Sequence, residues 1–79
     1  MISVIIPEGL WEGSDPGSVA NWFFENGAAV RAGDLLCEVM TEKVTHEIRA
    51  PASGILSIRA PTDTVVYKTG VVAVIQPVG

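Results

Sequence analysis

One stretch of the chain decides the fold: residues 33–50 read GDLLCEVMTEKVTHEIRA. Two runs, 35–39 and 44–49, lie on either side of a short polar segment, and in each of them every second residue belongs to one mainly apolar face (Leu35, Cys37 and Val39; Val44, His46 and Ile48). Because side chains on a β-strand point alternately to opposite faces, this pattern predicts two strands joined by a hairpin. Glu42 and Lys43 are expected at its tip, in solvent, and the absence of glycine favours a type I turn.

The segments outside this hairpin are also typical of short strands. Glycine and proline leave few intervals long enough for a helix, and those intervals are rich in Val and Ile. Residues 2–6 alternate, and residues 71–75 form an apolar run typical of a strand buried on both sides. Residues 18–26 are the only candidate helix, but their β-branched and aromatic content and their Asn26-Gly27 end favour a strand that enters a turn. The sequence therefore predicts an all-β domain.

An internal repeat relates these strands to one another. A shift of 37 residues, without a gap, places Gly17 on Gly54 and Gly33 on Gly70. We therefore expect two similar halves related by an approximate two-fold axis, each covering the apolar face of the other.

The composition describes one small acidic domain. The chain has 79 residues, 48% of them hydrophobic, and its nine acidic and five basic residues give a formal net charge of −4. A chain of this size has one thin core and no room for a deep catalytic cleft, which argues against a self-contained enzyme. The negative charge argues against nucleic acid and anionic membranes as partners. The chain shows no signal peptide and no apolar run near the ~18 residues of a membrane span, so we expect a cytoplasmic location.

Reactive side chains outside the hairpin tip have structural interpretations. Cys37, the single cysteine, alternates with apolar residues and is expected to be a small buried hydrophobe. His46 is expected to be partly buried with its polar atoms satisfied, rather than a metal ligand. Lys68 falls on Arg31 in the repeat and is interpreted as a generic cation. Trp11 lies in a polar loop, residues 8–16, where it either covers one end of the barrel or contacts a partner.

The hairpin and its flanks resemble the lipoyl-attachment signature of 2-oxo acid dehydrogenase acyltransferases. The similarity includes GDLLCEVMTEKVT and the following APASG, and with its flanks it covers residues 2–75. It implies a flattened β-barrel or sandwich of two four-stranded antiparallel sheets with a modified lysine on a hairpin at one end. By this resemblance Lys43 is the attachment point of lipoate, and Glu42 and Val44 identify it to the attaching enzyme. Residues 1–79 would form a single carrier domain, which could be the N-terminal module of a longer acyltransferase chain.

The resemblance also implies partners for a domain that has no activity of its own. A lipoate ligase or transferase would modify Lys43, and a thiamine-diphosphate-dependent 2-oxo acid decarboxylase would reductively acylate the lipoyl group. An acyltransferase core would pass the acyl group to coenzyme A, and a dihydrolipoyl dehydrogenase would reoxidise the dithiol. The isolated domain is expected to be monomeric. We expect Trp11, Glu12 and Asp15 to contact the decarboxylase, because the corresponding loop in the family lies near the lysine hairpin.

Two other functions stay open. Biotinyl domains have a similar fold and also use a hairpin lysine, but that lysine typically lies between two methionines rather than beside Glu42 and Val44. The second alternative is an unmodified small β-barrel that binds proteins. Met40 stands where many lipoyl domains have an acidic residue, and the run around it is most similar to acyltransferases of the branched-chain type. Thr64 replaces a usual turn glycine, and a positive φ there would strain a β-branched residue.

Overall fold

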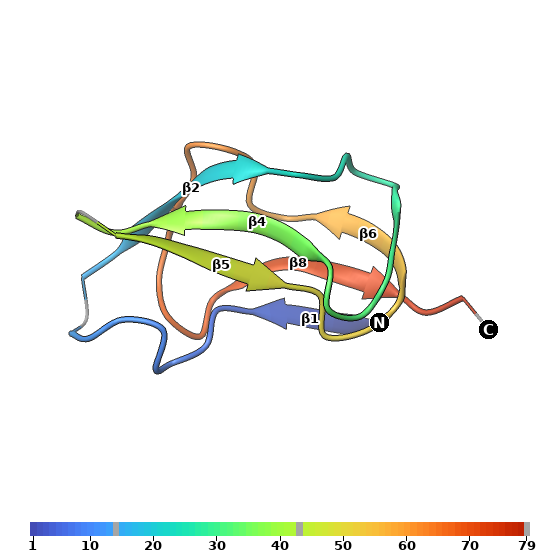
Figure 1. The fold of residues 1–79 in the computed structure, drawn as a ribbon, viewed down its shortest axis with the longest axis horizontal. Coiled ribbons are helices and arrows are strands. Elements are labelled where there is room, and N and C mark those ends of the chain that lie inside the picture. Colours follow the sequence, from blue (N-terminus) through green and yellow to red (C-terminus); the bar gives the residue numbers. More distant parts are fainter. Residues whose placement is uncertain (14, 43, 79) are drawn as a thin grey trace.

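The structure, a computed structural model, describes residues 1–13, 15–42 and 44–78 and contains eight strands in two antiparallel sheets (Figure 1). The first sheet has the order β1 (Ile2–Ile5), β8 (Val71–Gln76), β6 (Gly54–Ile58), β3 (Ala29–Val30). The second sheet has the order β5 (Thr45–Arg49), β4 (Leu35–Met40), β2 (Gly17–Trp22), β7 (Val65–Val66). The described residues form no helix, and the candidate helix at 18–26 is a strand followed by a turn. The predicted sandwich of two four-stranded sheets is confirmed.

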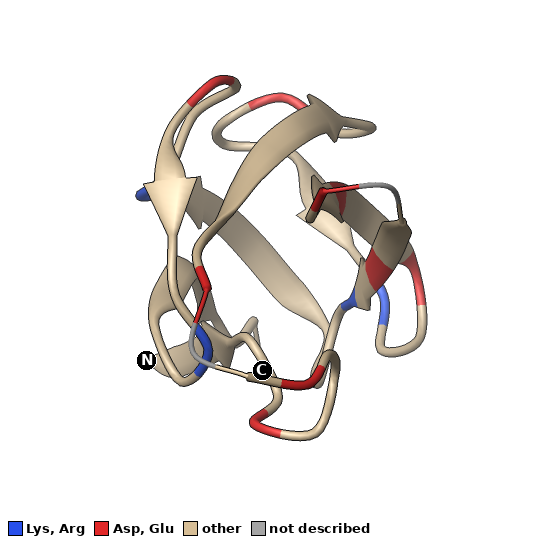
Figure 2. Cartoon of the chain, turned by 90° about the vertical axis from the view of Figure 1, so that its left-hand side faces the viewer, with Lys and Arg blue, Asp and Glu red and all other residues tan. Residues whose placement is uncertain are grey.

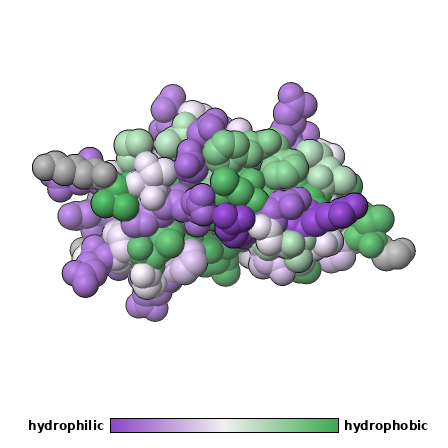
Figure 3. All heavy atoms as spheres, viewed as in Figure 1, coloured by the Kyte–Doolittle hydropathy of each residue, from purple (hydrophilic) through white to green (hydrophobic). Residues whose placement is uncertain are grey.

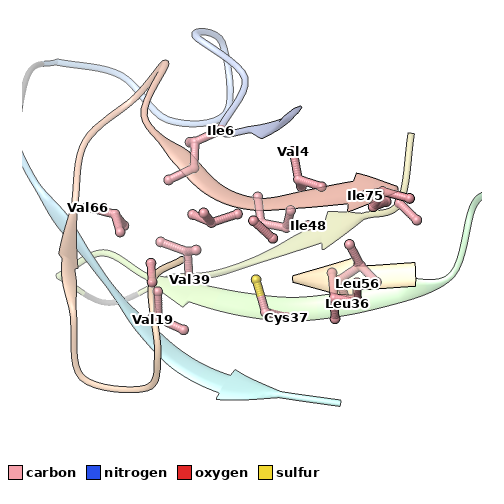
Figure 4. Packing of buried hydrophobic residues seen from close by; sticks show 14 of the residues in the cluster. Val4, Ile6, Val19, Leu36, Cys37, Val39, Ile48, Leu56, Val66 and Ile75 are labelled. Carbon is pink, nitrogen blue, oxygen red and sulfur yellow. The ribbon is translucent and has the colours of Figure 1, made fainter. Parts of the chain in front are cut away.

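The core lies between the two sheets, and both contribute inward-facing aliphatic side chains (Figure 4). The largest fully buried side chains are Val4, Ile6, Val19, Leu36, Cys37, Val39, Leu56, Val72 and Ile75. Because burial of each methylene group contributes about 0.8 kcal/mol, this layer is the main stabilising element. The described residues place no third layer over the outer faces of the sheets, and Figure 3 shows hydrophobic residues among hydrophilic ones on one side of the molecule.

Two pairs of adjacent residues face the core together, which simple alternation does not allow. These are Leu36 and Cys37 in β4 and Val72 and Ala73 in β8, all fully buried. The β4–β5 and β1–β8 ladders each skip one residue at these pairs, as at a β-bulge. The prediction that the last strand is buried on both sides is wrong, because Val71 is 45% exposed on the uncovered face of the sheet.

Matching backbone hydrogen bonds show the approximate two-fold relation between the halves. The N–H of Gly27 donates to the Leu56 carbonyl at 2.7 Å, and the N–H of Asp63 donates to the Val19 carbonyl at 2.8 Å. Leu56 thus corresponds to Val19 at a shift of 37, whereas Asp63 corresponds to Gly27 at a shift of 36. The ungapped repeat is correct for the first residues of β2 and β6 and wrong from the bulge after Val19 onward. At this bulge the β2–β4 ladder skips one residue, whereas the β6–β8 ladder skips none.

The change of shift also moves the left-handed backbone positions. Gly27 and Gly33 have φ values of 90° and 91°, and their counterparts Asp63 and Thr69 have values of 72° and 69°. The positive φ considered for Thr64 therefore falls on an aspartate, which tolerates this region better. Thr69 is the β-branched residue that is strained.

The β4–β5 connection and the chain termini lie at opposite ends of the sandwich (Figure 1). Ile2 pairs with Ile75, so β1 begins beside the end of β8. The β1–β2 loop, residues 6–16, reaches the end that carries the β4–β5 connection. The two segments singled out in the sequence therefore meet at one end.

Candidate functional site

The β4–β5 connection, residues 41–44, is the tip of the hairpin predicted from the sequence. The N–H of Thr41 donates to the Val44 carbonyl at 2.9 Å and so joins the two ends of the connection. Glu42 is exposed, and Val44 is 53% exposed. Lys43 lies outside the described residues, and the turn type stays a prediction. Both expected recognition neighbours of the lysine are thus open to solvent.

His46 lies directly below this tip, on the side of β5 that faces the core. It stands opposite the buried Val39 in the β4–β5 ladder and is itself half-buried. Its Nε2 atom lies 3.1 Å from Oγ1 of Thr41, and its ring centroid lies 5.3 Å from that of Trp11, with 39° between the rings. The prediction of a partly buried histidine with a hydrogen-bond partner is confirmed.

Trp11 closes the β1–β2 loop on itself through one contact and fastens it to the barrel through the others. Its Nε1 donates to the Asp15 carbonyl at 3.0 Å, and its own carbonyl accepts a hydrogen bond from Nζ of Lys68 at 2.9 Å. Its ring packs against His46 and the core, so the structure supports the covering role of Trp11. The interpretation of Lys68 as a generic cation is wrong, because its partly buried ammonium group holds the loop.

A hollow of about 510 Å³ lies between the loop and the hairpin tip. The described residues that line it are Trp11, Glu12, Asp15, Pro16, Thr41, Glu42 and Val44. The expected proximity of the loop to the hairpin is therefore confirmed. Among the described residues that line the hollow, three side chains are acidic and none is basic, which favours a basic partner. Figure 2 views the molecule from this end and shows acidic segments spread over its loops.

The other reactive groups in the part of the chain that the structure describes do not gather into a second site. Cys37 is fully buried, and its burial, with a smaller contribution from the charge of Glu38, raises the pKa of its thiol to about 12. Such a thiol stays protonated at neutral pH and is no nucleophile. The described residues include no group of three or more His, Cys, Asp or Glu side chains that could hold a metal ion. They also form no helix long and apolar enough to cross a membrane.

Sequence reasoning missed two contributors to this end of the molecule. Thr41 offered a signal, because a threonine at the start of a turn often bonds to a backbone group a few residues later. Its hydroxyl lies 3.4 Å from the Val44 carbonyl. Lys68 offered no signal, since its partner Trp11 is 57 residues away in the chain.

Known proteins share this geometry. The profile of the Biotin_lipoyl family, described as biotin-requiring enzyme, matches residues 11–75. The solution structure of the lipoyl domain of the 2-oxoglutarate dehydrogenase complex from Azotobacter vinelandii superposes with a TM-score of 0.77. That alignment covers 100% of both chains at 26% sequence identity.

Two curated relatives are similar in sequence over most of this chain. The dihydrolipoyllysine-residue succinyltransferase component of the Rickettsia typhi 2-oxoglutarate dehydrogenase complex is 39% identical over 62 residues, which are 78% of this chain and 15% of the relative. The dihydrolipoyllysine-residue acetyltransferase component of the Corynebacterium glutamicum pyruvate dehydrogenase complex is 40% identical over 74 residues, 92% of this chain and 11% of the relative. This chain thus spans a small part of their length. Their names do not support the expected similarity to the branched-chain type.

Proposed function

The chain belongs to the biotin/lipoyl attachment family, as a domain of the kind found in 2-oxo acid dehydrogenase acyltransferases, and we propose that it carries lipoate as an amide on Lys43. The hairpin tip is the observation that supports this most directly. A four-residue connection stands at one end of a rigid sandwich, with exposed Glu42 and Val44 on either side of the lysine. The open hollow beside the tip leaves room for a long arm.

This geometry suits a carrier with no catalytic activity of its own. Bound lipoate supplies a dithiolane that can hold an acyl group and two electrons. The strands β4 and β5 fix both ends of the connection, and the Thr41–Val44 hydrogen bond closes it. A group tethered on such a base meets each partner enzyme at a high effective concentration, which replaces free diffusion.

The proposed partners use different parts of this end. A lipoate ligase or transferase would recognise Glu42 and Val44. A thiamine-diphosphate-dependent decarboxylase would instead bind at the acidic hollow, where it would contact Glu12, Asp15 and the exposed edge of Trp11. An acyltransferase core and a dihydrolipoyl dehydrogenase complete the set, with this monomeric domain as one module of a longer cytoplasmic acyltransferase chain. Succinyl and acetyl groups are the acyl groups to test first, because the two relatives are named as a succinyltransferase and an acetyltransferase. Branched-chain acyl groups come third.

Intact mass after expression with lipoate and a lipoate ligase tests the attachment. We expect one lipoyl increment, which Lys43→Arg abolishes and Lys68→Arg retains, since these are the only two lysines. Amide formation removes one positive charge, so the formal charge moves from −4 to −5 and the modified domain runs faster on a native gel. An increment that persists in Lys43→Arg would contradict the assignment, and no increment at all would favour the unmodified interaction module.

A biotin ligase tests the nearest alternative. The wild-type domain should be refused by this enzyme, while Glu42→Met combined with Val44→Met should gain some biotinylation, because biotinyl lysines typically lie between methionines. Strong biotinylation of the wild-type sequence would reverse the order of the two carrier functions.

Charge neutralisation tests the decarboxylase contact without disturbing the loop. Glu12→Gln with Asp15→Asn should lower the rate of reductive acylation several-fold at low salt, because complementary charges speed association, and should leave lipoylation near wild type. Glu25→Gln with Asp63→Asn is the matched control, since it removes the same charge from exposed residues that do not line the hollow. Single-turnover kinetics at two ionic strengths measures the effect. Equal rates for the two double variants would place the contact elsewhere.

A further inference from the structure

One side chain connects the β1–β2 loop to the hairpin tip. His46 occupies an inward-facing position of β5, in line with the buried Ile48 and Ala50 further along the chain. An apolar side chain would fill this position and pack under Trp11 equally well. Only a polar side chain can also form a hydrogen bond with the Thr41 hydroxyl, whose Oγ1 atom lies 3.1 Å from Nε2 of His46.

Thr41, the first residue of the connection, forms hydrogen bonds with Val44, its last residue. Both its N–H, at 2.9 Å, and its hydroxyl, at 3.4 Å, approach the same carbonyl oxygen of Val44. A hydrogen bond joins Nε2 of His46 to the Thr41 hydroxyl, whichever of these two groups is the donor. This bond restricts the rotation of the Thr41 side chain about χ1. The orientation of Thr41 therefore depends on a ring that the strand and Trp11 hold in place.

We propose that His46 is a positioning residue for lipoyl attachment: it holds the 41–44 connection in the geometry that the attaching enzyme binds, and it couples that geometry to the β1–β2 loop through Trp11. The inference rests on the proposed function of Lys43. The contacts on which it stands lie entirely within the described residues Trp11, Thr41, Val44 and His46.

The expected kinetic effect is on binding rather than on chemistry. If the hydrogen bond is lost, the competent geometry is populated for a smaller fraction of the time, and the apparent affinity falls by that fraction. A hydrogen bond of ordinary strength corresponds to about a 3- to 10-fold change in such an equilibrium. The ligase should therefore show a KM for the domain that is about 3- to 10-fold higher, with kcat within about two-fold of wild type.

Four variants separate positioning from packing. His46→Phe keeps a ring under Trp11 but removes the ring nitrogen, whereas His46→Gln places an amide near the position of Nε2 and should recover most of the KM. Thr41→Val removes the hydroxyl at nearly constant volume and should raise the KM at least as much as His46→Phe, because it also removes the contact of the hydroxyl with the Val44 carbonyl. Thr45→Val, at an exposed β5 position next to the connection, is the matched control and should leave the KM unchanged.

A double variant and an assay on the unmodified domain complete the test. In the His46→Phe background, Thr41→Val should raise the KM much less than it does in wild type, since the His46–Thr41 hydrogen bond is already lost and only the longer contact of the hydroxyl with Val44 remains to be removed. In the unmodified domain, the amide proton of Thr41 should exchange faster in His46→Phe than in wild type or His46→Gln. A wild-type KM and wild-type Thr41 exchange in a folded His46→Phe protein would overturn the inference, as would additive effects in the double variant.

These readouts separate the inference from the proposed function. A wild-type domain that no ligase modifies would refute lipoyl attachment, whereas the exchange of the Thr41 amide would still show whether His46 orders the connection.

Discussion

Substitution of three glycines by alanine tests how closely neighbouring strands approach one another, because the loss of stability should be largest where the space for a side chain is smallest. Gly17 and Gly54 open β2 and β6 and are related by the approximate two-fold axis. A Cβ atom on Gly54 would overlap the carbonyl oxygen of Gln76 in the neighbouring strand and lie 2.8 Å from the carbonyl carbon. A Cβ atom on Gly17 would lie 2.8 Å from Cγ1 of Val39, a side-chain atom, while Gly9 has no atom within 4 Å of that position.

The nature of each obstacle sets the size of the effect. At Gly54 the obstacle is backbone, so β6 and β8 must separate, and we expect a loss of about 3 kcal/mol or more. At Gly17 the nearest obstacle is a side chain that can shift, and we expect a loss of about 1–2 kcal/mol. Gly9→Ala should stay within about 0.5 kcal/mol of wild type. A domain of this size has roughly 4–12 kcal/mol of stability in total, so Gly54→Ala removes a large fraction of it.

Thermal and urea unfolding of the unmodified domain, followed by circular dichroism, measures this order. With about 4–8 °C per kcal/mol for a domain of this size, Gly54→Ala should lower Tm by at least about 12 °C. The folded fraction should still be lipoylated, because Gly54 lies beside Gln76, at the end opposite the hairpin tip. A Tm for Gly54→Ala within a few degrees of that for Gly9→Ala would refute the close approach of β6 to β8.

Two further predictions concern single residues. Cys37→Ala should weaken the pH dependence of unfolding above pH 9: the folded thiol has its pKa raised to about 12, so the stability it contributes is complete below the unfolded value of 9.0 and is lost as the pH rises towards 12. Urea unfolding at pH 7, 9 and 10.5 tests this, and parallel pH profiles for wild type and variant would contradict it. Thr69 is a β-branched residue in the left-handed region, a conformation that destabilises the fold by roughly 1–2 kcal/mol. Thr69→Gly removes this strain and should raise Tm by several degrees. Thr62→Gly, at an exposed connecting residue, is the control, and a lower Tm for Thr69→Gly than for wild type would contradict the strain.

Alternation of apolar residues was sufficient to predict an all-β domain, and the repeat predicted two halves that cover one another. The sandwich of two four-stranded sheets was implied by the resemblance to lipoyl domains, and the register of the repeat was predicted incorrectly. Gly17 and Gly54 correspond because each begins a strand that lies against its neighbour without space for a side chain. The second pair of glycines suggested the same shift, but the true counterpart of Gly33 is Thr69, which has a φ of 69°. Threonine is among the residues least expected in the left-handed region, so no local preference indicates that position.

The contacts around the site could not be predicted because they join distant parts of the chain. The hairpin, its exposed neighbours and the burial of Cys37 follow from local pattern. The ring of Trp11 over His46 and the Lys68 hydrogen bond to the loop depend on how the loop crosses the end of the barrel. Composition indicates only that such a loop is polar and contains a tryptophan.

The approximate symmetry explains why function is concentrated at one end. The two-fold axis relates β1 to β5 and exchanges the two ends of the sandwich, so each end has a counterpart at the other. The β1–β2 loop has eleven residues, whereas its counterpart between β5 and β6 has four. The β4–β5 connection joins its two strands directly, whereas the corresponding strands β8 and β1 are paired but are not consecutive in the chain. Both departures from symmetry fall at the same end, where the longer loop lines the hollow beside the hairpin tip and its Trp11 covers His46. The core needs only the symmetric part, and the asymmetric additions form the site.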